Sequence, residues 1–405
     1  MPKEILRDEY MLTKLPVILL FCIGVTPHLN IGNNLLYLDD LPVILILGIF
    51  IITMFQGRDF ILRKVYKMKY FYFWVLFLIY ILLNPSIVLG YFSITTDFMR
   101  YAFLFTVLFL LFYFEDSKDF ISRVSTGLLI LLSLFSIVSF FFELSFGTDA
   151  YNYWKIGFNP NNWGFTGGRI NGFQAGGPNS FGDLICILTL KVVSDNKVNG
   201  RIYNLILFMG YTGCFFTFSR SSILVLTFFS IILLILQKRT SSLVILSAAI
   251  LLSVNFGLVD RFLSQSETDG IKDRIEMQSA TAQIIQERSA KNSIFGYGFN
   301  QFAVVRSEVK PINEFSDNLR PTGPHNGYAF QLLNYGYVGL VLFLALVIYP
   351  LLRLNSYRVS YLVGTQNLLP ISAFLVLNFA GDLFQNQSIA WIFWLYLFEF
   401  YKEHS

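Results

Sequence analysis

The chain has 405 residues, of which 55% are hydrophobic and only 14% carry a formal charge. Soluble globular domains carry about 25% charged residues, so the composition excludes that class and indicates a protein that crosses a membrane several times. The formal net charge of +4 is too small to indicate a protein that binds nucleic acid.

Apolar stretches long enough to cross a bilayer recur along the whole chain. A transmembrane helix needs about 20 residues, and fewer where interfacial residues complete the crossing. The sequence therefore predicts an all-α polytopic membrane protein with twelve spans, of which the seventh and eighth could also form one broken helix around the stretch FSRSS. In chain order the predicted spans cover residues 13–28, 41–56, 70–90, 98–114, 124–146, 179–194, 202–218, 221–237, 241–257, 332–352, 360–380 and 387–401.

The loops between these spans alternate in charge. Short loops rich in Lys and Arg stay in the cytoplasm, and such loops follow the second, fourth, sixth, eighth and tenth spans. The short loops HLNIGNNLLYLDD, NPSIVLGYFSITTD and GDLFQNQ contain no Lys or Arg, so we expect them on the outer side. This alternation predicts that both termini lie in the cytoplasm. No small-residue cleavage site follows the mixed-charge N-terminus, so we expect the first helix to be retained.

We expect one integral membrane domain over residues 1–405, with long outer loops at 147–178 and 258–331. Long loops in a compact protein are usually functional or disordered. The second loop contains GIKDRIEMQSATAQIIQERSAKNS, in which apolar residues recur with helical spacing. The sequence therefore predicts an amphipathic helix near the outer membrane surface.

Two stretches carry arginines in unusual surroundings. Arg220 lies in FTFSRSS between two apolar runs, where an arginine is a functional candidate, although it could also snorkel to the interface. Arg169 and Asn179 lie in GGRINGFQAGGPNSFGD, whose glycines allow the backbone to approach a bulky ligand closely. We expect Arg169 and Asn179 to bind substrate, the alternative being an ordinary irregular loop.

Further basic residues gather in the predicted outer loops, where they could recognise an anionic ligand or be solvated and paired with nearby acids. Arg274 and Arg288 are fourteen residues apart, close to four helical turns, so they lie on nearly one face of a helix. The same spacing separates them by roughly 21 Å. They cannot bind the same small anion, and Arg274 is a separate candidate for substrate binding.

One of the three histidines lies at the end of the second outer loop. In the stretch GPHNGY, His325 precedes Asn326 at the predicted outer face. A histidine there can accept a proton from a hydroxyl nucleophile near neutral pH, so His325 is a candidate general base and Asn326 a candidate substrate-binding neighbour. The alternative is a purely structural role for His325. The three cysteines show no metal-binding spacing, and we expect no disulfide framework, metal or cofactor.

Four stretches occur in a fixed order: GGRINGFQAGGPNSFG, FTFSRSS, ERSAKNSIFGYGFNQF and PHNGYAFQLLNYGYVGL. In this order, over residues 165–345, the chain resembles the O-antigen ligase and O-antigen polymerase superfamily of bacterial membrane glycosyltransferases. The resemblance implies a C-type glycosyltransferase-like fold and a metal-independent, inverting transfer of glycans carried on undecaprenyl diphosphate. It also implies catalytic roles for Arg220, Arg288 and His325. The stretch after Arg288 lacks the tryptophan expected there.

Three functions are compatible with this resemblance and topology. The first is a polymerase that joins undecaprenyl-diphosphate-linked repeat units into O-antigen, capsular polysaccharide or exopolysaccharide. The second is a ligase that transfers finished glycan to lipid A core, and the third is a flippase. A flippase should show charges inside central helices and internal repeats, which the sequence does not show clearly.

We expect the polymerase, because divergent flanking helices suit a strain-specific acceptor sugar. Its expected location is the bacterial cytoplasmic (inner) membrane. Expected partners are the lipid-linked glycan donor and acceptor, the lipid bilayer, a chain-length regulator and a flippase, with no nucleic acid.

Overall fold

The computed structural model describes residues 28–31, 34–37, 69–113, 118–146, 158–159, 169–170, 177–194, 200–217, 219–237, 265–299, 324, 326–352, 367–381 and 386–404, with a few single positions between them. The predicted spans 13–28, 41–56 and 241–257 fall almost entirely outside the described residues, as does His325.

The described part of the chain is predominantly α-helical, as predicted. Its helices are α3 (Lys69–Leu89), α4 (Thr96–Tyr113), α5 (Lys118–Phe146), α7 (Gly177–Val193), α8 (Gly200–Phe216), α9 (Arg220–Gln237), α12 (Gln265–Glu287), α13 (Ala290–Phe295), α15 (Gly327–Leu351), α17 (Leu368–Ala380) and α18 (Gln387–His404).

Two short antiparallel strand pairs depart from the all-α prediction. One pairs β1 (His28–Ile31) with β2 (Asn34–Tyr37), within the first predicted outer loop. The other pairs β3 (Phe158–Asn159) with β4 (Arg169–Ile170), within the predicted loop 147–178. Both pairs are local additions to a helical fold.

Every predicted span within the described residues coincides with a helix, and the seventh and eighth spans are two separate helices, α8 and α9. Among the described residues, three helical stretches are long and apolar enough to cross a membrane: Lys69–Leu89, Phe120–Ser139 and Gly327–Leu351. These stretches support the prediction of a membrane protein. The full count of twelve spans remains a prediction.

Two helices form the centre of the fold. In α7, every residue from Phe181 to Val193 is buried, and in α18 every residue from Ile389 to Tyr401 is buried. A helix that is buried around its whole circumference lies inside a bundle, and most of the buried side chains of α7 and α18 are apolar. Aromatic side chains then join α18 to the neighbouring helices, as in the contact between Trp74 and Trp394, whose ring centroids lie 4.9 Å apart.

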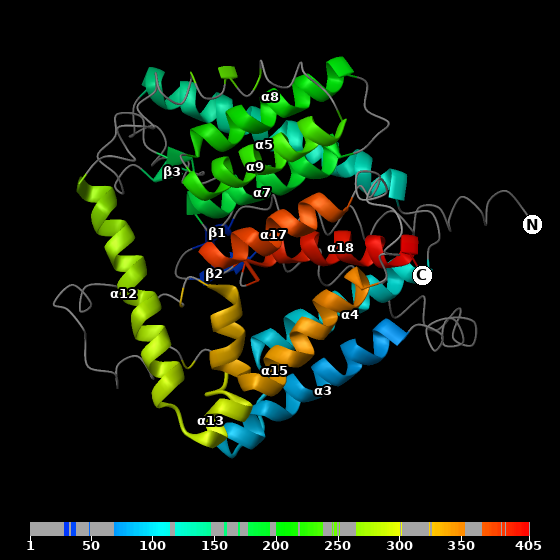
Figure 1. Ribbon diagram of the computed structural model, residues 1–405, viewed down its shortest axis with the longest axis vertical. Helices are drawn as coiled ribbons and strands as arrows, with labels where there is room; N and C mark the ends of the chain where they lie inside the picture. The colour runs from blue at the N-terminus through cyan, green and yellow to red at the C-terminus, as the bar shows by residue number, and fades with distance from the viewer. Residues whose placement is uncertain are drawn as a thin grey trace, which may run out of the picture.

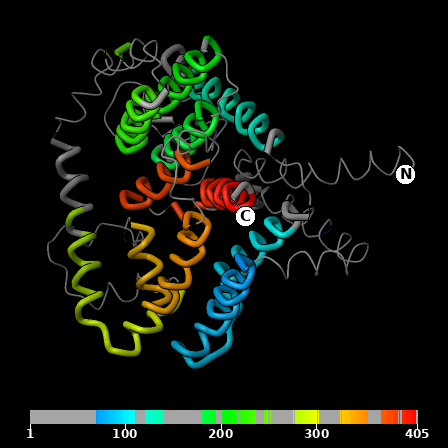
Figure 2. The backbone as a smooth tube through the Cα atoms, turned by 45° about the vertical axis from the view of Figure 1, so that its right-hand side comes forward, coloured from blue at the N-terminus to red at the C-terminus, as the bar shows by residue number. Residues whose placement is uncertain are grey.

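Most of the long helices run roughly side by side, whereas α12 runs crosswise along one edge of the bundle (Figures 1 and 2). The helix predicted in this segment is present as α12, and its position near the outer membrane surface remains a prediction. Its buried residues Met277, Thr281 and Ile284 recur at helical spacing, while Ile275 is exposed. The segment predicted as a long outer loop therefore contains a helix that packs on the bundle.

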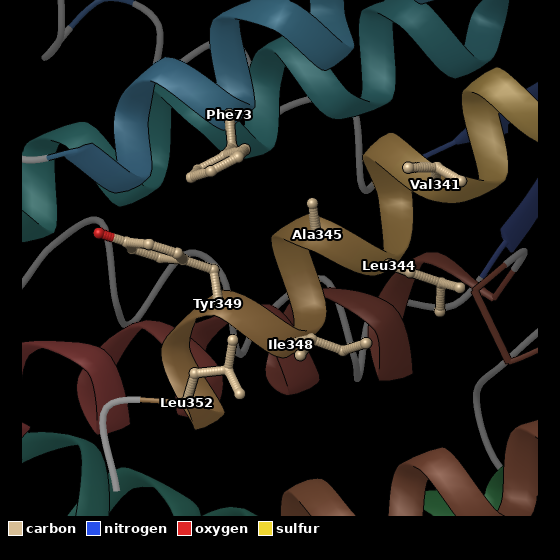
Figure 3. Close-up of a pocket in the computed structure, with 7 residues that line it drawn as sticks. All are labelled: Phe73, Val341, Leu344, Ala345, Ile348, Tyr349 and Leu352. Atoms are coloured by element: carbon tan, nitrogen blue, oxygen red, sulfur yellow. The ribbon is translucent and has the colours of Figure 1, made fainter.

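An apolar groove of about 360 Å³ runs between α3 and the second half of α15 (Figure 3). None of its lining side chains carries a charge, so the groove cannot bind a phosphate group. Its surface suits a hydrocarbon chain. Its lining residues are Phe73, Val341, Leu344, Ala345, Ile348, Tyr349 and Leu352.

The charge alternation gives a testable topology. A reporter fused after residue 65 or residue 196 is expected to lie in the cytoplasm, because short basic loops stay on that side. A reporter at residue 160 or residue 300 is expected on the outer side. Alkaline phosphatase and green fluorescent protein fusions measure the two outcomes separately, and a cytoplasmic result at residue 300 would contradict the assignment of the outer face.

Candidate functional site

Helix α15 breaks in its middle, at Gly336. This residue has φ 64° and ψ −167°, which are not helical values, and the two halves of α15 point in clearly different directions (Figure 1). The first half lies beside α13, and the second half packs along α3. A break of this kind exposes backbone polar groups, and inside a membrane protein these groups need partners from neighbouring elements.

The carbonyl groups before the break find those partners in the segment that follows α13. In an unbroken helix, the carbonyls of Leu333 and Asn334 would accept from amides four residues later. Here the Leu333 carbonyl accepts from the Tyr297 amide at 2.8 Å, and the Asn334 carbonyl accepts from the Gly298 amide at 3.0 Å. The segment GYG, residues 296–298, therefore supplies the hydrogen bonds that α15 loses at its break.

Helix α3 supplies the next donors. The hydroxyl of Tyr80 donates to the Tyr335 carbonyl at 2.6 Å. The side-chain amide of Asn84 donates to the Phe295 carbonyl, at the end of α13, at 2.7 Å. Tyr80 and Asn84 thus join α3, α13 and α15 at one point, so the break is a fixed feature of the packing.

Glycine is required on both sides of this contact. Gly296 and Gly336 both have positive φ values, of 81° and 64°, which disfavour residues with a side chain. A Cβ atom on Gly296 would lie 2.3 Å from the carbonyl oxygen of Asn334, and one on Gly336 would lie 2.3 Å from that of Ile294. The two backbones approach too closely for any other residue.

Arg288 lies at the junction of α12 and α13, beside this break. Its guanidinium carbon lies 4.7 Å from the centroid of the Tyr337 ring, one residue beyond Gly336. Only 9% of Arg288 is exposed, yet its Nε and Nη1 atoms have no hydrogen-bond partner among the described residues. A buried guanidinium with unpaired donors is costly unless a partner satisfies it, so Arg288 is a candidate for binding an anion.

Unpaired amide groups lie on the same part of α15. The Gln331 side-chain oxygen and the Asn334 side-chain nitrogen are buried without a hydrogen-bond partner in the described part of the protein. Both residues precede the break by less than two helical turns. Buried polar groups normally have partners, so these amides are candidates for contact with water or ligand.

Arg220 lies at a second interruption, between α8 and α9. It is the first residue of α9 and is partly buried. Ser219 and Ser222 flank it, and the Ser222 hydroxyl donates to Asp183 of α7 at 2.6 Å. A Cβ atom on Gly182 would lie 2.7 to 2.8 Å from side-chain atoms of this segment, so α7 packs tightly against it. The backbone position of Arg220 is thereby fixed.

The predicted substrate-binding residues lie on different elements. Asn179 is in the first turn of α7 and is partly buried. Arg169 lies in β4, opposite Asn159 of β3, and Arg274 lies in α12, but both of their side chains fall outside the described residues. The binding roles of these three residues remain predictions.

Asn326 caps the N-terminus of α15. Its side-chain oxygen accepts hydrogen bonds from the backbone amides of Tyr328 and Ala329 at 3.0 and 3.1 Å. These contacts satisfy two amides that have no partner inside the helix. Asn326 therefore has a structural role, and a substrate-binding role would have to use its amide nitrogen.

Several residues of these two interruptions were not predicted as functional. Tyr80, Asn84 and Asp183 lie inside apolar spans, where each polar side chain could have been noticed as an exception. The described helices also contain other buried charges, Lys191 of α7 and Glu399 of α18. Central helices therefore contain buried charged residues, which the sequence did not show clearly.

The comparisons with known proteins agree with this location. Residues 205–344 match a family of proteins described as O-antigen ligase. The matched segment begins in α8, contains Arg220 and Arg288, and ends eight residues after the Gly336 break. The match confirms the resemblance in sequence motifs to the O-antigen ligase and polymerase superfamily. A search of curated proteins found no match.

Proposed function

We propose, from the O-antigen ligase family domain at residues 205–344, that the protein is a polymerase of lipid-linked oligosaccharide repeat units. In this proposal it joins units carried on undecaprenyl diphosphate, at the outer face of the bacterial cytoplasmic membrane. One observation carries the proposal: within the family domain, Arg288 is buried beside a helix break with two guanidinium nitrogens unpaired. Such a group fits the diphosphate of the donor.

The reaction requires this kind of cation. The bond between the anomeric carbon of the donor sugar and its phosphate oxygen breaks, and the electron pair stays on the leaving diphosphate. A fixed guanidinium stabilises the negative charge that accumulates on the leaving group. Tyr337 supports the guanidinium from one side, at 4.7 Å from its ring centroid, which leaves the unpaired N–H groups for the anion. Arg220 is proposed as the second cation.

The acceptor supplies the new bond. A hydroxyl oxygen of the acceptor sugar attacks the anomeric carbon from the face opposite the diphosphate, so a single displacement inverts the configuration. The hydroxyl proton passes to a base, for which His325 is the proposed group. His325 precedes the Asn326 cap, so its backbone joins the start of α15, close in sequence to the broken helix.

The lipid part of the substrate is proposed to lie along the membrane-facing helices. The apolar groove between α3 and α15 begins at Val341, one helical turn after Tyr337 (Figure 3). The groove therefore continues along α15, the helix whose Tyr337 ring contacts Arg288. An amphipathic ligand with a charged head and a long hydrocarbon tail would place its head at Arg288 and its tail in the apolar groove. A chain-length regulator and a flippase are proposed partners of the polymerase.

Ligase activity is the second candidate, because the family description names a ligase. Both activities use the same donor and the same leaving group, and they differ in the acceptor. Purified protein supplied with lipid-linked repeat units alone is expected to form a ladder of longer glycans. Transfer that occurs only when lipid A core is added would establish the ligase and contradict the polymerase.

His325→Ala is expected to lower the transfer rate on the order of 10² to 10⁴-fold, because the acceptor hydroxyl would lose its base. The protein should accumulate normally. Asn326→Ala provides the neighbouring comparison: loss of the helix cap is expected to cost about 1 kcal/mol of stability, with a smaller loss of transfer. Transfer by the purified variants, measured between about pH 5 and about pH 9, separates these effects. A well-expressed His325→Ala variant with near wild-type transfer would show that His325 is structural.

A further inference from the structure

A buried carboxylate faces the broken helix from α4. Asp97, in the first turn of α4, is completely buried. One of its oxygens accepts a hydrogen bond from the Tyr335 hydroxyl at 2.9 Å, and the other accepts from Arg100 Nη1 at 3.2 Å. Beside this contact, the Gln331 amide donates to the Tyr101 hydroxyl at 3.2 Å. The first turn of α4 is thus joined to the last turn of α15 before the break.

A fully buried carboxylate is costly, and buried ionisable residues are functional candidates for that reason. The nearby guanidinium of Arg100 offsets part of the cost of ionisation. When Asp97 is ionised, the bond from Tyr335 is a hydrogen bond to a charged group, which is shorter and stronger than one between neutral groups. Asp97 therefore holds the Tyr335 ring more firmly than apolar packing alone would.

Tyr335 is fixed at both ends. Its hydroxyl donates to Asp97, and its backbone carbonyl accepts from the Tyr80 hydroxyl at 2.6 Å. The next residue is Gly336, where α15 changes direction, and the one after it is Tyr337, which supports the guanidinium of Arg288. Because only Gly336 separates Tyr335 from Tyr337, a shift of Tyr335 would also move the Tyr337 ring beside Arg288.

We propose that Asp97 is a positioning residue for the anion-binding site. Through the Tyr335 hydroxyl it fixes the direction of α15 at the break, and so holds Tyr337 and Arg288 in the geometry that binds the diphosphate of the donor. This inference rests on the proposed function of Arg288. Packing of the helices alone would not require a carboxylate at position 97.

The test measures binding of inorganic pyrophosphate to the full-length protein in detergent, by the shift of its thermal unfolding temperature with pyrophosphate concentration. Tyr335→Phe removes only the hydroxyl, and Asp97→Asn removes the charge and replaces one acceptor oxygen by an amide donor. Each variant is expected to bind pyrophosphate roughly tenfold more weakly than wild type, the size of effect expected when a hydrogen bond to a charged group is lost.

Tyr396→Phe is the matched control. The Tyr396 hydroxyl is also buried and lies 2.8 Å from the Ser125 hydroxyl, but α18 and α5 carry neither the break nor Arg288. This variant is expected to lose a comparable amount of stability and to bind pyrophosphate like wild type. A decrease in affinity caused by general loosening of the bundle would appear in Tyr396→Phe as well, and would overturn the proposal.

The combination with Arg288→Ala separates the inference from the proposed function. If Asp97 acts through Arg288, then Tyr335→Phe combined with Arg288→Ala should bind pyrophosphate no more weakly than Arg288→Ala alone. Wild-type affinity in Tyr335→Phe, with weakened binding in Arg288→Ala, would refute the positioning role and leave the proposed function intact. Unchanged affinity in Arg288→Ala would contradict both.

Discussion

Arg288→Ala is expected to lower glycan transfer on the order of 10² to 10³-fold, the loss seen when one fixed donor is removed from a site of developing negative charge. The variant should still accumulate in the membrane. In the described structure the buried guanidinium leaves Nε and Nη1 unpaired, so its removal relieves a cost of burial and breaks no hydrogen bond of those two atoms. Quantitative immunoblotting of membranes together with a transfer assay measures both parts of this result.

Lys272→Ala is the matched control, because it removes a basic residue from the same helix, α12, at a position to which no role is assigned. It is expected to keep wild-type transfer. Arg220→Ala is expected to lose transfer in the same way as Arg288→Ala, and Arg220→Lys should also lose most of it, because an ammonium group cannot make a planar two-pronged contact. Full transfer in Arg288→Ala, at a normal level of protein, would exclude the diphosphate contact.

Gly336→Ala is expected to prevent accumulation of a stable protein. The new methyl group would lie 2.3 Å from the carbonyl oxygen of Ile294, and the residue would also have to keep a positive φ of 64°. This backbone conformation alone costs about 1 to 3 kcal/mol for a residue with a side chain, and the overlap with backbone cannot be relieved by a side-chain rotation. The loss should exceed several kcal/mol, which is a large part of the stability of a typical fold.

The control for this substitution is Gly127→Ala in α5, where a Cβ atom would meet nothing within 4 Å. That change is expected to leave the protein unchanged or to stabilise it by up to about 1 kcal/mol, because alanine favours the helix more than glycine does. Thermal unfolding in detergent compares the two variants. Normal unfolding of Gly336→Ala would mean that α15 does not need the break at this residue.

The helical part of the fold could be predicted from sequence because it depends on local composition. The stretches that form α3, α5 and α15 are apolar over about the thickness of a bilayer, and the 3.6-residue period of the apolar side chains of α12 is visible without any tertiary information. Arg220 was also identifiable, because an arginine between two apolar runs is unusual in any membrane fold.

The break in α15 could not be predicted, because its cause lies far away in the sequence. The stretch after Gly336 is apolar and the stretch before it is mostly so, and glycine is common in membrane helices. The hydrogen bonds that stabilise the break come from Tyr297 and Gly298, and from Tyr80, which lies more than 250 residues before Tyr335. Only the packing of α3, α13 and α15 shows that these groups meet.

The buried charges were missed for a related reason. Asp97 stands at the end of a short outer loop, so the sequence allows it to be a solvated residue at a helix start. Its burial depends on contact with Tyr335, which is 238 residues away. Lys191 lies near the end of the predicted span 179–194, where a lysine can reach solvent, yet it is buried, bonded to Asn367 and 5.3 Å from the centroid of the Tyr396 ring.

The most direct test of the central claim uses the purified protein alone, in vesicles that contain a defined undecaprenyl-diphosphate-linked repeat unit. Wild-type protein is expected to release one undecaprenyl diphosphate for each glycosidic bond formed, as measured by chromatography of the lipid and glycan products. Arg288→Ala and His325→Ala should release almost none, and Lys272→Ala should match wild type. Movement of the lipid-linked unit across the vesicle membrane, with no release of undecaprenyl diphosphate, would contradict the account and identify a transporter.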